Sequence, residues 1–223
     1  PLLLIIYPLI TSESRGVWLA LVFSITLVSL RHISHKNLTK KTITNLIIPI
    51  LIVSIGSLTL LKDNIELTIK KTQSEIHQIE SGELNNSIGL RFQMWLAAPS
   101  LIKDNIILGS GDKHQLEIKQ LYDDGKISSS LYEFNPTHYH NQFLDKFIKS
   151  GIVGLIMLIA LMIYPVIISH KLSTRKEMLV LSIVSVIFIA SLSDVPLNHP
   201  QPLILFLLLL FPICSRCKRV SND

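Results

Sequence analysis

The chain has 223 residues, of which 48% are hydrophobic and only 17% are charged. Soluble domains carry about 25% charged residues, and the apolar residues here are gathered in long blocks without charge, so the composition excludes an ordinary soluble domain. The net charge of +5 comes largely from Lys and Arg beside the apolar blocks. We interpret it as a signal of membrane topology, and it makes nucleic acid an unsuitable partner.

The apolar blocks predict helices in chain order. Residues 1–10 are expected to be the end of a helix whose beginning precedes this sequence. Residues 15–30 and 42–61 approach the length of about 20 mainly apolar residues that crosses a bilayer. The final third is expected to hold two or three more membrane helices, the first containing Pro165, where a kink is tolerated.

These blocks predict an all-α fold, a polytopic membrane helix bundle with a large outward (periplasmic) helical loop segment. The divisions we expect are membrane helices at 1–61, the loop segment with amphipathic helices at 62–149, C-terminal membrane helices at 150–214 and a cytoplasmic tail at 215–223. The last helix is ambiguous, because 195–214 is long enough to span but begins with prolines that oppose a regular helix.

Lys and Arg near the helix ends set the orientation, since they are enriched on the cytoplasmic side. They place 31–41, 170–177 and the tail in the cytoplasm, and therefore 11–15, 62–149 and 194–202 outside. The tail holds Cys214 and Cys217, which form at most half of a zinc site, so we expect two reduced thiols.

Two amphipathic helices are expected in the outer segment. Apolar positions from Ile65 to Ile79 recur at spacings of four and three, which indicates a helix that lies in the headgroup layer or packs on the protein itself. A second helix is expected at 91–101, capped by Asn86 or Ser87 and closed or kinked by Pro99.

The rest of the outer segment is more polar. Gly109 and Gly111 mark a turn, and the irregular stretch 112–137 is expected to be a mobile loop. Helical character resumes at His140 and is expected to run into the next membrane helix, apart from Gly151 and Gly154.

Three polar residues on the outer side are candidates for chemistry. Arg15, between Ser14 and Gly16, and Arg91 offer guanidinium groups that bind phosphate oxygens in a planar, two-pronged geometry. His140, at a helix start beside Asn141, can accept a proton near neutral pH. Each residue also has a non-catalytic interpretation. Arg15 would be an interfacial anchor, Arg91 a surface residue of a helix, and His140 a solvated loop histidine.

Other chemistries find little support. His114, His138 and His140 lack a carboxylate or cysteine at close sequence spacing, so no metal is expected. The chain also has no phosphate-binding glycine loop, no nucleophile elbow and no Asp-x-Asp pair. No cofactor is expected.

Three short motifs in series resemble the O-antigen ligase and polymerase superfamily. They are Thr11–Gly16 opening a helix; Arg91-x3-Trp95 with the proline and glycine turn that follow it; and His140-Asn141-Gln142-Phe143-Leu144 before a membrane helix. The resemblance covers about residues 1–160.

The resemblance implies a metal-independent, inverting glycosyltransferase in the bacterial inner membrane, multi-pass, with its active site on the periplasmic side. The donor would be a glycan on undecaprenyl pyrophosphate, and the acceptor a sugar hydroxyl of lipid A–core. Arg15 and Arg91 would bind the pyrophosphate and His140 would orient or deprotonate the acceptor. Asp194 would be the acidic residue that such ligases carry near the outer end of a late helix.

Several activities stay open. Ligation to lipid A–core, polymerisation of repeat units and transfer to protein share these motifs, and ligation is the interpretation we favour. A lipid-linked glycan transporter would need polar residues along its membrane helices, and 17–30 and 178–193 offer only Ser and Thr. A purely structural membrane subunit would leave Arg15, Arg91 and His140 individually replaceable.

Overall fold

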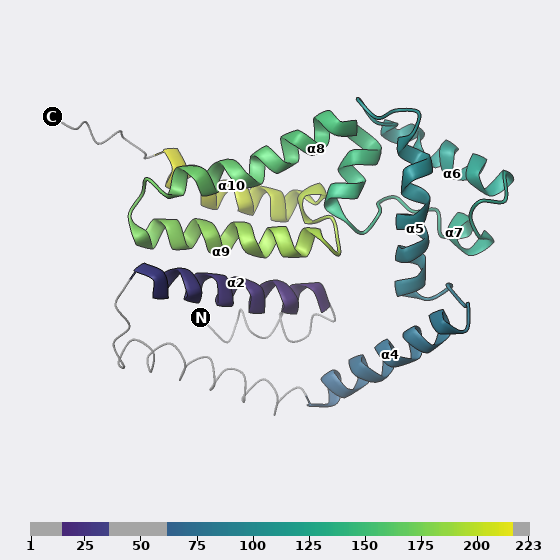
Figure 1. Ribbon diagram of the computed structural model, residues 1–223, viewed down its shortest axis with the longest axis horizontal. Coiled ribbons are helices and arrows are strands. Elements are labelled where there is room, and N and C mark those ends of the chain that lie inside the picture. The colour runs from purple at the N-terminus through teal and green to yellow at the C-terminus, as the bar shows by residue number, and fades with distance from the viewer. Residues whose placement is uncertain (1–14, 36–61, 216–223) are drawn as a thin grey trace.

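The structure, a computed structural model, describes residues 15–35 and 62–215. These residues form helices without a strand among them, so the predicted all-α fold is confirmed (Figure 1). The helices are α2 (Arg15–His35), α4 (Lys62–Glu80), α5 (Ser87–Ile102), α6 (His114–Asp123), α7 (Ser129–Phe134), α8 (Gln142–Ser169), α9 (Thr174–Ser191) and α10 (Pro200–Ser215), with short 3-10 turns η1 (Gly111–Lys113) and η2 (Pro196–Asn198). The helices predicted at 1–10 and 42–61, and most of the tail, lie outside the described residues.

Four helices run side by side in a bundle: α2, the second half of α8, α9 and α10 (Figure 1). Among the described helices, α8 alone is long and apolar enough to cross a membrane, by length and composition. The apolar part of α2 and α10 are shorter. That the bundle crosses the membrane several times therefore stays a prediction. Its core consists of Leu158, Met162, Val180, Val184, Leu197, Phe206 and Leu210.

Small residues bring α2 close to α9. Gly16, Ala20 and Ser24 recur at every fourth position and so share one face of α2. Ala20 is fully buried, and the Ser24 hydroxyl donates a hydrogen bond to the Ser182 carbonyl at 3.2 Å. Small residues at this spacing allow two helix backbones to approach closely, as in membrane proteins.

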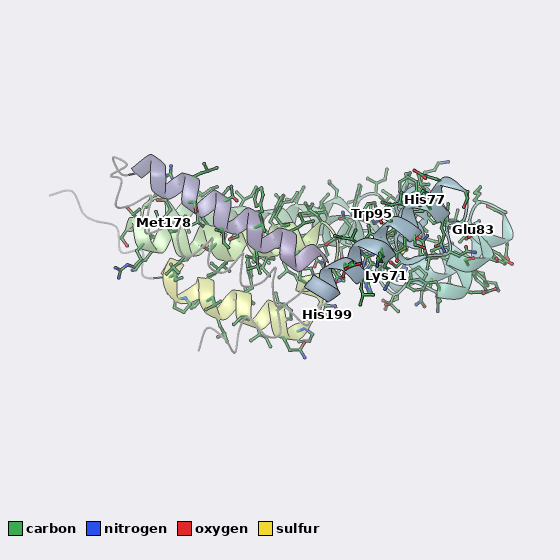
Figure 2. All side chains as sticks on the ribbon, turned by 90° about the horizontal axis from the view of Figure 1, so that it is seen from below. Lys71, His77, Glu83, Trp95, Met178 and His199 are labelled. Atoms are coloured by element: carbon green, nitrogen blue, oxygen red, sulfur yellow. The ribbon has the colours of Figure 1, made fainter. Side chains whose placement is uncertain are left out.

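The bundle has two chemically distinct ends. At one end Arg31 Nη2 and His170 Nδ1 each lie 2.8 Å from Glu177 Oε1, which joins two segments predicted to be cytoplasmic. At the other end lie the start of α2, the start of α8 and η2. Figure 2 shows Met178 at the first end and Trp95 and His199 toward the other.

A second core lies in the outer segment, where α5, α6 and α7 pack beside the start of α8 (Figure 1). It includes Met94, Leu101, Ile118, Leu121, Leu131, Tyr139 and Ile148. The Asn86 side chain caps α5 by accepting from the Gly89 amide at 2.8 Å. Pro99 does not close α5, which continues to Ile102.

The prediction of a mobile loop at 112–137 is wrong. The stretch holds η1, α6 and α7. Its apolar residues are few, but His114, Ile118 and Leu121 fall at spacings of four and three and are buried on one face of α6. One narrow apolar face is enough for a short helix that packs against an existing core, because tertiary contacts then supply its stability.

Of the two glycines predicted to interrupt α8, Gly151 does so, with φ 62° and ψ −165°, whereas Gly154 is helical. Residues on both sides of the break bond to the preceding loop: the Ile152 amide donates to the Ile106 carbonyl and the Ser110 amide to the Ile148 carbonyl, both at 2.8 Å. A Cβ on Gly151 would lie 2.2 Å from the Ile107 carbonyl oxygen. Glycine is therefore required, both by its positive φ and by the closeness of the loop.

The last helix, α10, begins later than the predicted range 195–214. A helix at 195–214 is wrong at its start, because Pro196 opens η2 and His199 is extended before α10 begins at Pro200. Proline is tolerated in the first turn of a helix but breaks a helix interior. The three prolines within residues 196–202 therefore separate η2 from α10.

Candidate active site

His140 lies in the loop before α8, held from several sides. Its backbone has φ 46°, a left-handed conformation that non-glycine residues rarely adopt and that marks functional sites. The neighbouring Asn141 caps α8, accepting hydrogen bonds from the amides of Phe143 and Leu144 at 3.1 and 3.0 Å. Its side-chain amide also donates to the Leu192 carbonyl at 3.3 Å, which ties the loop to the end of α9.

Tyr139 anchors the same loop from the inside. Its side chain is 1% exposed, its hydroxyl lies 3.1 Å from His114 Nδ1, and its carbonyl accepts from the Trp95 indole at 2.9 Å. Burial raises the pKa of Tyr139 and lowers that of His114, so both are neutral at pH 7 and serve structure. This anchor fixes the backbone on which His138 and His140 sit.

Asp194 lies opposite these two histidines, in the turn after α9. Its Oδ1 is 3.6 Å from His140 Nδ1 and 3.9 Å from His138 Nε2. These distances fit ion pairs with a protonated imidazole and exceed a direct hydrogen bond. The two rings meet edge to face with centroids 4.4 Å apart. The sequence places the histidines more than fifty residues from Asp194, and the fold brings them together.

The charges of this cluster follow from its surroundings. The His140 imidazole, together with the Val195 amide 2.9 Å away, lowers the pKa of Asp194 to about 2, so the carboxylate is charged at neutral pH. Burial and the neighbouring His140 lower the pKa of His138. A carboxylate facing Nδ1 of His140 favours a proton on that atom, which leaves Nε2 to accept one.

The same three side chains could hold a divalent cation. Ligand atoms of His138, His140 and Asp194 lie within 4.8 Å of one another, and two imidazoles with a carboxylate suit Zn²⁺. His140 Nδ1 is buried without a hydrogen bond to any described residue, which also fits a missing ligand.

Arg91 lies on α5, one helical turn before Trp95. Residues four apart share a helix face, and Trp95 contacts the Tyr139 carbonyl, so Arg91 lies on the face of α5 that meets the His140 loop. It is half-buried and forms no hydrogen bond or ion pair with any other residue of the described ranges. Within those ranges, no side chain competes with an anion for its guanidinium.

Arg15 is the first residue of α2, and its side chain is outside what the structure describes, as is all of Ser14. Its neighbour Gly16 packs on the turn that carries Asp194: a Cβ there would lie 2.3 Å from Ser193 Oγ. The backbone of Arg15 is therefore next to this turn. The start of α2, the His140 loop and Asp194 therefore lie at the same end of the bundle.

Comparison with known proteins assigns the chain to a family. A family model described as O-antigen ligase matches residues 1–159. The chain belongs to the O-antigen ligase family. It is also 32% identical over 158 residues to a Haemophilus influenzae protein described as an uncharacterized protein, a match that covers 70% of this chain and 38% of that protein. The chain thus spans less than half the length of that relative.

Membership of the O-antigen ligase family confirms the resemblance that the three motifs indicated. The matched residues include Arg15, Arg91 and His140. Asp194 lies beyond them, so its place beside His140 rests on the geometry alone.

Two groups in or near the cluster of His140 and Asp194 did not stand out in the sequence. His138 was noted only as a weak metal ligand, although its ring contacts His140. Gln142 and Asp145 are 0% and 1% exposed at the start of α8, where a polar pair looks like an ordinary solvated first turn. Their spacing carries no signal of burial, because their partners lie on a distant segment.

Proposed function

We propose that the chain carries the catalytic site of an O-antigen ligase. The enzyme transfers a glycan from undecaprenyl pyrophosphate to a sugar hydroxyl of lipid A–core, on the periplasmic face of the bacterial inner membrane. The observation that carries the proposal is His140, which lies 3.6 Å from the carboxylate of Asp194, in the turn that contacts Gly16 at the start of α2.

In the proposed reaction His140 Nε2 takes the proton from the acceptor hydroxyl. The acceptor oxygen then bonds to the anomeric carbon of the donor sugar, and the bond from that carbon to the pyrophosphate oxygen breaks with inversion. Asp194 stabilises the imidazolium that forms. The electron pair and negative charge leave with undecaprenyl pyrophosphate.

Arg15 and Arg91 are proposed to bind the pyrophosphate and to stabilise the charge that develops on it. The supporting observations are the place of Arg15 beside the Asp194 turn and the position of Arg91 one turn from Trp95. With two fixed cations for the leaving group, the proposed mechanism needs no metal or cofactor.

The test is His140→Ala in the full-length protein, in a host lacking its own copy, with lipopolysaccharide examined by gel. We expect lipid A–core without attached glycan, while polymerised glycan still accumulates on its lipid carrier. His77→Ala is the matched control, because His77 is 82% exposed on α4, away from the site, and its loss leaves the ladder intact.

Other results would overturn the assignment. Lipopolysaccharide with a single repeat unit would identify a polymerase. An unchanged ladder, with the His140→Ala protein present in the membrane, would remove His140 from the chemistry.

A further inference from the structure

A polar clasp, formed by Gln142, Asp145 and Asn198, joins the first turn of α8 to η2. Gln142 Nε2 donates to Asn198 Oδ1 at 2.8 Å, and Asn198 Nδ2 donates to Asp145 Oδ2 at 2.7 Å. The Leu197 amide donates to Gln142 Oε1 at 2.8 Å. The side-chain amide oxygen and nitrogen of Gln142 and of Asn198 thus each have a hydrogen-bond partner more than fifty residues away in sequence.

The Asp145 carboxylate extends the clasp toward the histidine loop. Its Oδ1 accepts from the Tyr139 amide at 3.3 Å and lies 2.9 Å from Lys149 Nζ. The same ammonium donates to the Thr137 carbonyl at 2.7 Å. A buried carboxylate is tolerated only when it is paired and hydrogen-bonded. The Asp145 carboxylate contacts Tyr139 and Lys149, which lie on either side of His140 in sequence.

The clasp, with the Tyr139 amide that bonds to it, lies close in sequence to the proposed catalytic pair of His140 and Asp194. Tyr139 and Gln142 flank His140 in sequence, and Asn198 follows Asp194 by four residues. The pair itself is held by no direct hydrogen bond, since 3.6 Å separates its nearest nitrogen and oxygen. The distance between them therefore depends on how the start of α8 sits against η2, which is what the clasp determines.

We propose that Gln142 and Asp145 are positioning residues for glycan transfer, which act through Asn198 to hold the Asp194 turn against His140. This inference rests on the proposed function. It also assigns the site a component beyond the family match, because Asn198 lies after residue 159. Buried polar networks of this kind fix one arrangement, because each unpaired member is costly.

The test is a swap within the clasp of the full-length protein. Asn198→Asp sets a carboxylate against Asp145 Oδ2 in place of the donor amide, and the two repel. Adding Asp145→Asn exchanges the two groups: Asn at 145 then donates to Asp at 198, which still accepts from Gln142, and the net charge is that of the wild type. Turnover is measured with purified lipid-linked donor and lipid A–core acceptor, and folding by thermal melting.

We expect Asn198→Asp to lower kcat by up to about 30-fold, the loss expected when the Asp194 charge no longer acts on His140, with little change in KM for the donor. The swapped pair is expected to recover most of the lost kcat. Wild-type kcat in Asn198→Asp, or a folded swap without recovery, would overturn the inference.

An Asp194→Asn background separates positioning from general structure. Because the clasp acts through Asp194, Asn198→Asp is expected to add no further loss there, whereas an equal loss in both backgrounds would overturn the inference. Wild-type activity of Asp194→Asn alone would refute the catalytic pair and the clasp with it. A loss in Asp194→Asn with none in Asn198→Asp would refute the clasp alone.

Discussion

Removing the charge of Asp194 measures how much the carboxylate contributes to transfer. Asp194→Asn keeps the shape of the side chain and abolishes its attraction for the imidazolium of His140. At 3.6 Å, this attraction is about 1 kcal/mol at the dielectric constant of water and about 5 kcal/mol at an effective value of about 20. The Asp194 side chain is 55% exposed, so solvent screens its attraction for His140. We therefore set the contribution of this attraction at about 2 kcal/mol.

A loss of about 2 kcal/mol of transition-state stabilisation lowers kcat by about 30-fold. The assay is transfer from undecaprenyl-pyrophosphate-linked glycan to lipid A–core by the purified full-length protein at pH 7. Asp124→Asn is the matched control, because Asp124 pairs with Lys126 at the surface, and it is expected to keep wild-type kcat. If Asp194→Asn also keeps it while His140→Ala is inactive, the reasoning on the pair is refuted.

Three further predictions concern the scaffold and the metal. Gly151→Ala is expected to cost at least about 3 kcal/mol of stability, because its Cβ would collide with the Ile107 backbone. Gly125→Ala, at φ 69° with no atom near its Cβ, is expected to cost about 1 kcal/mol. Thermal melting of the two variants tests the difference. Ala20→Leu is expected to overpack the α2–α9 contact by about 1–3 kcal/mol, while Val22→Leu at an exposed position leaves the melting temperature unchanged. Transfer is expected to be the same after EDTA treatment, and loss restored by Zn²⁺ would show that the two histidines and Asp194 hold a metal.

Much of the helical structure was predictable from local patterns. The apolar block behind Arg15 indicated α2, and the spacing of isoleucines indicated α4. Asn86 or Ser87 was expected to cap α5, and Asn86 does so. Gly151 was expected to interrupt α8, since only glycine adopts its backbone conformation without strain. These features depend on residues within a few positions of one another, and a sequence shows such relations directly.

The site was only partly predictable, because its contacts are distant in sequence. His140 was singled out by its helix start, and Asp194 by resemblance alone; no spacing rule connects them. The Gln142–Asn198 bond joins a helix start to a proline-rich turn, and neither segment indicates the other. α6 was missed because three buried residues in a polar stretch are a weak signal until a core exists to receive them.

The most direct test of the central claim is a comparison of purified full-length wild type and His140→Ala on labelled undecaprenyl-pyrophosphate-linked glycan with lipid A–core. Donor binding and product formation are measured on the same samples. The account predicts that His140→Ala binds the donor as the wild type does and forms no linked product. Product formed by His140→Ala at the wild-type rate would contradict it.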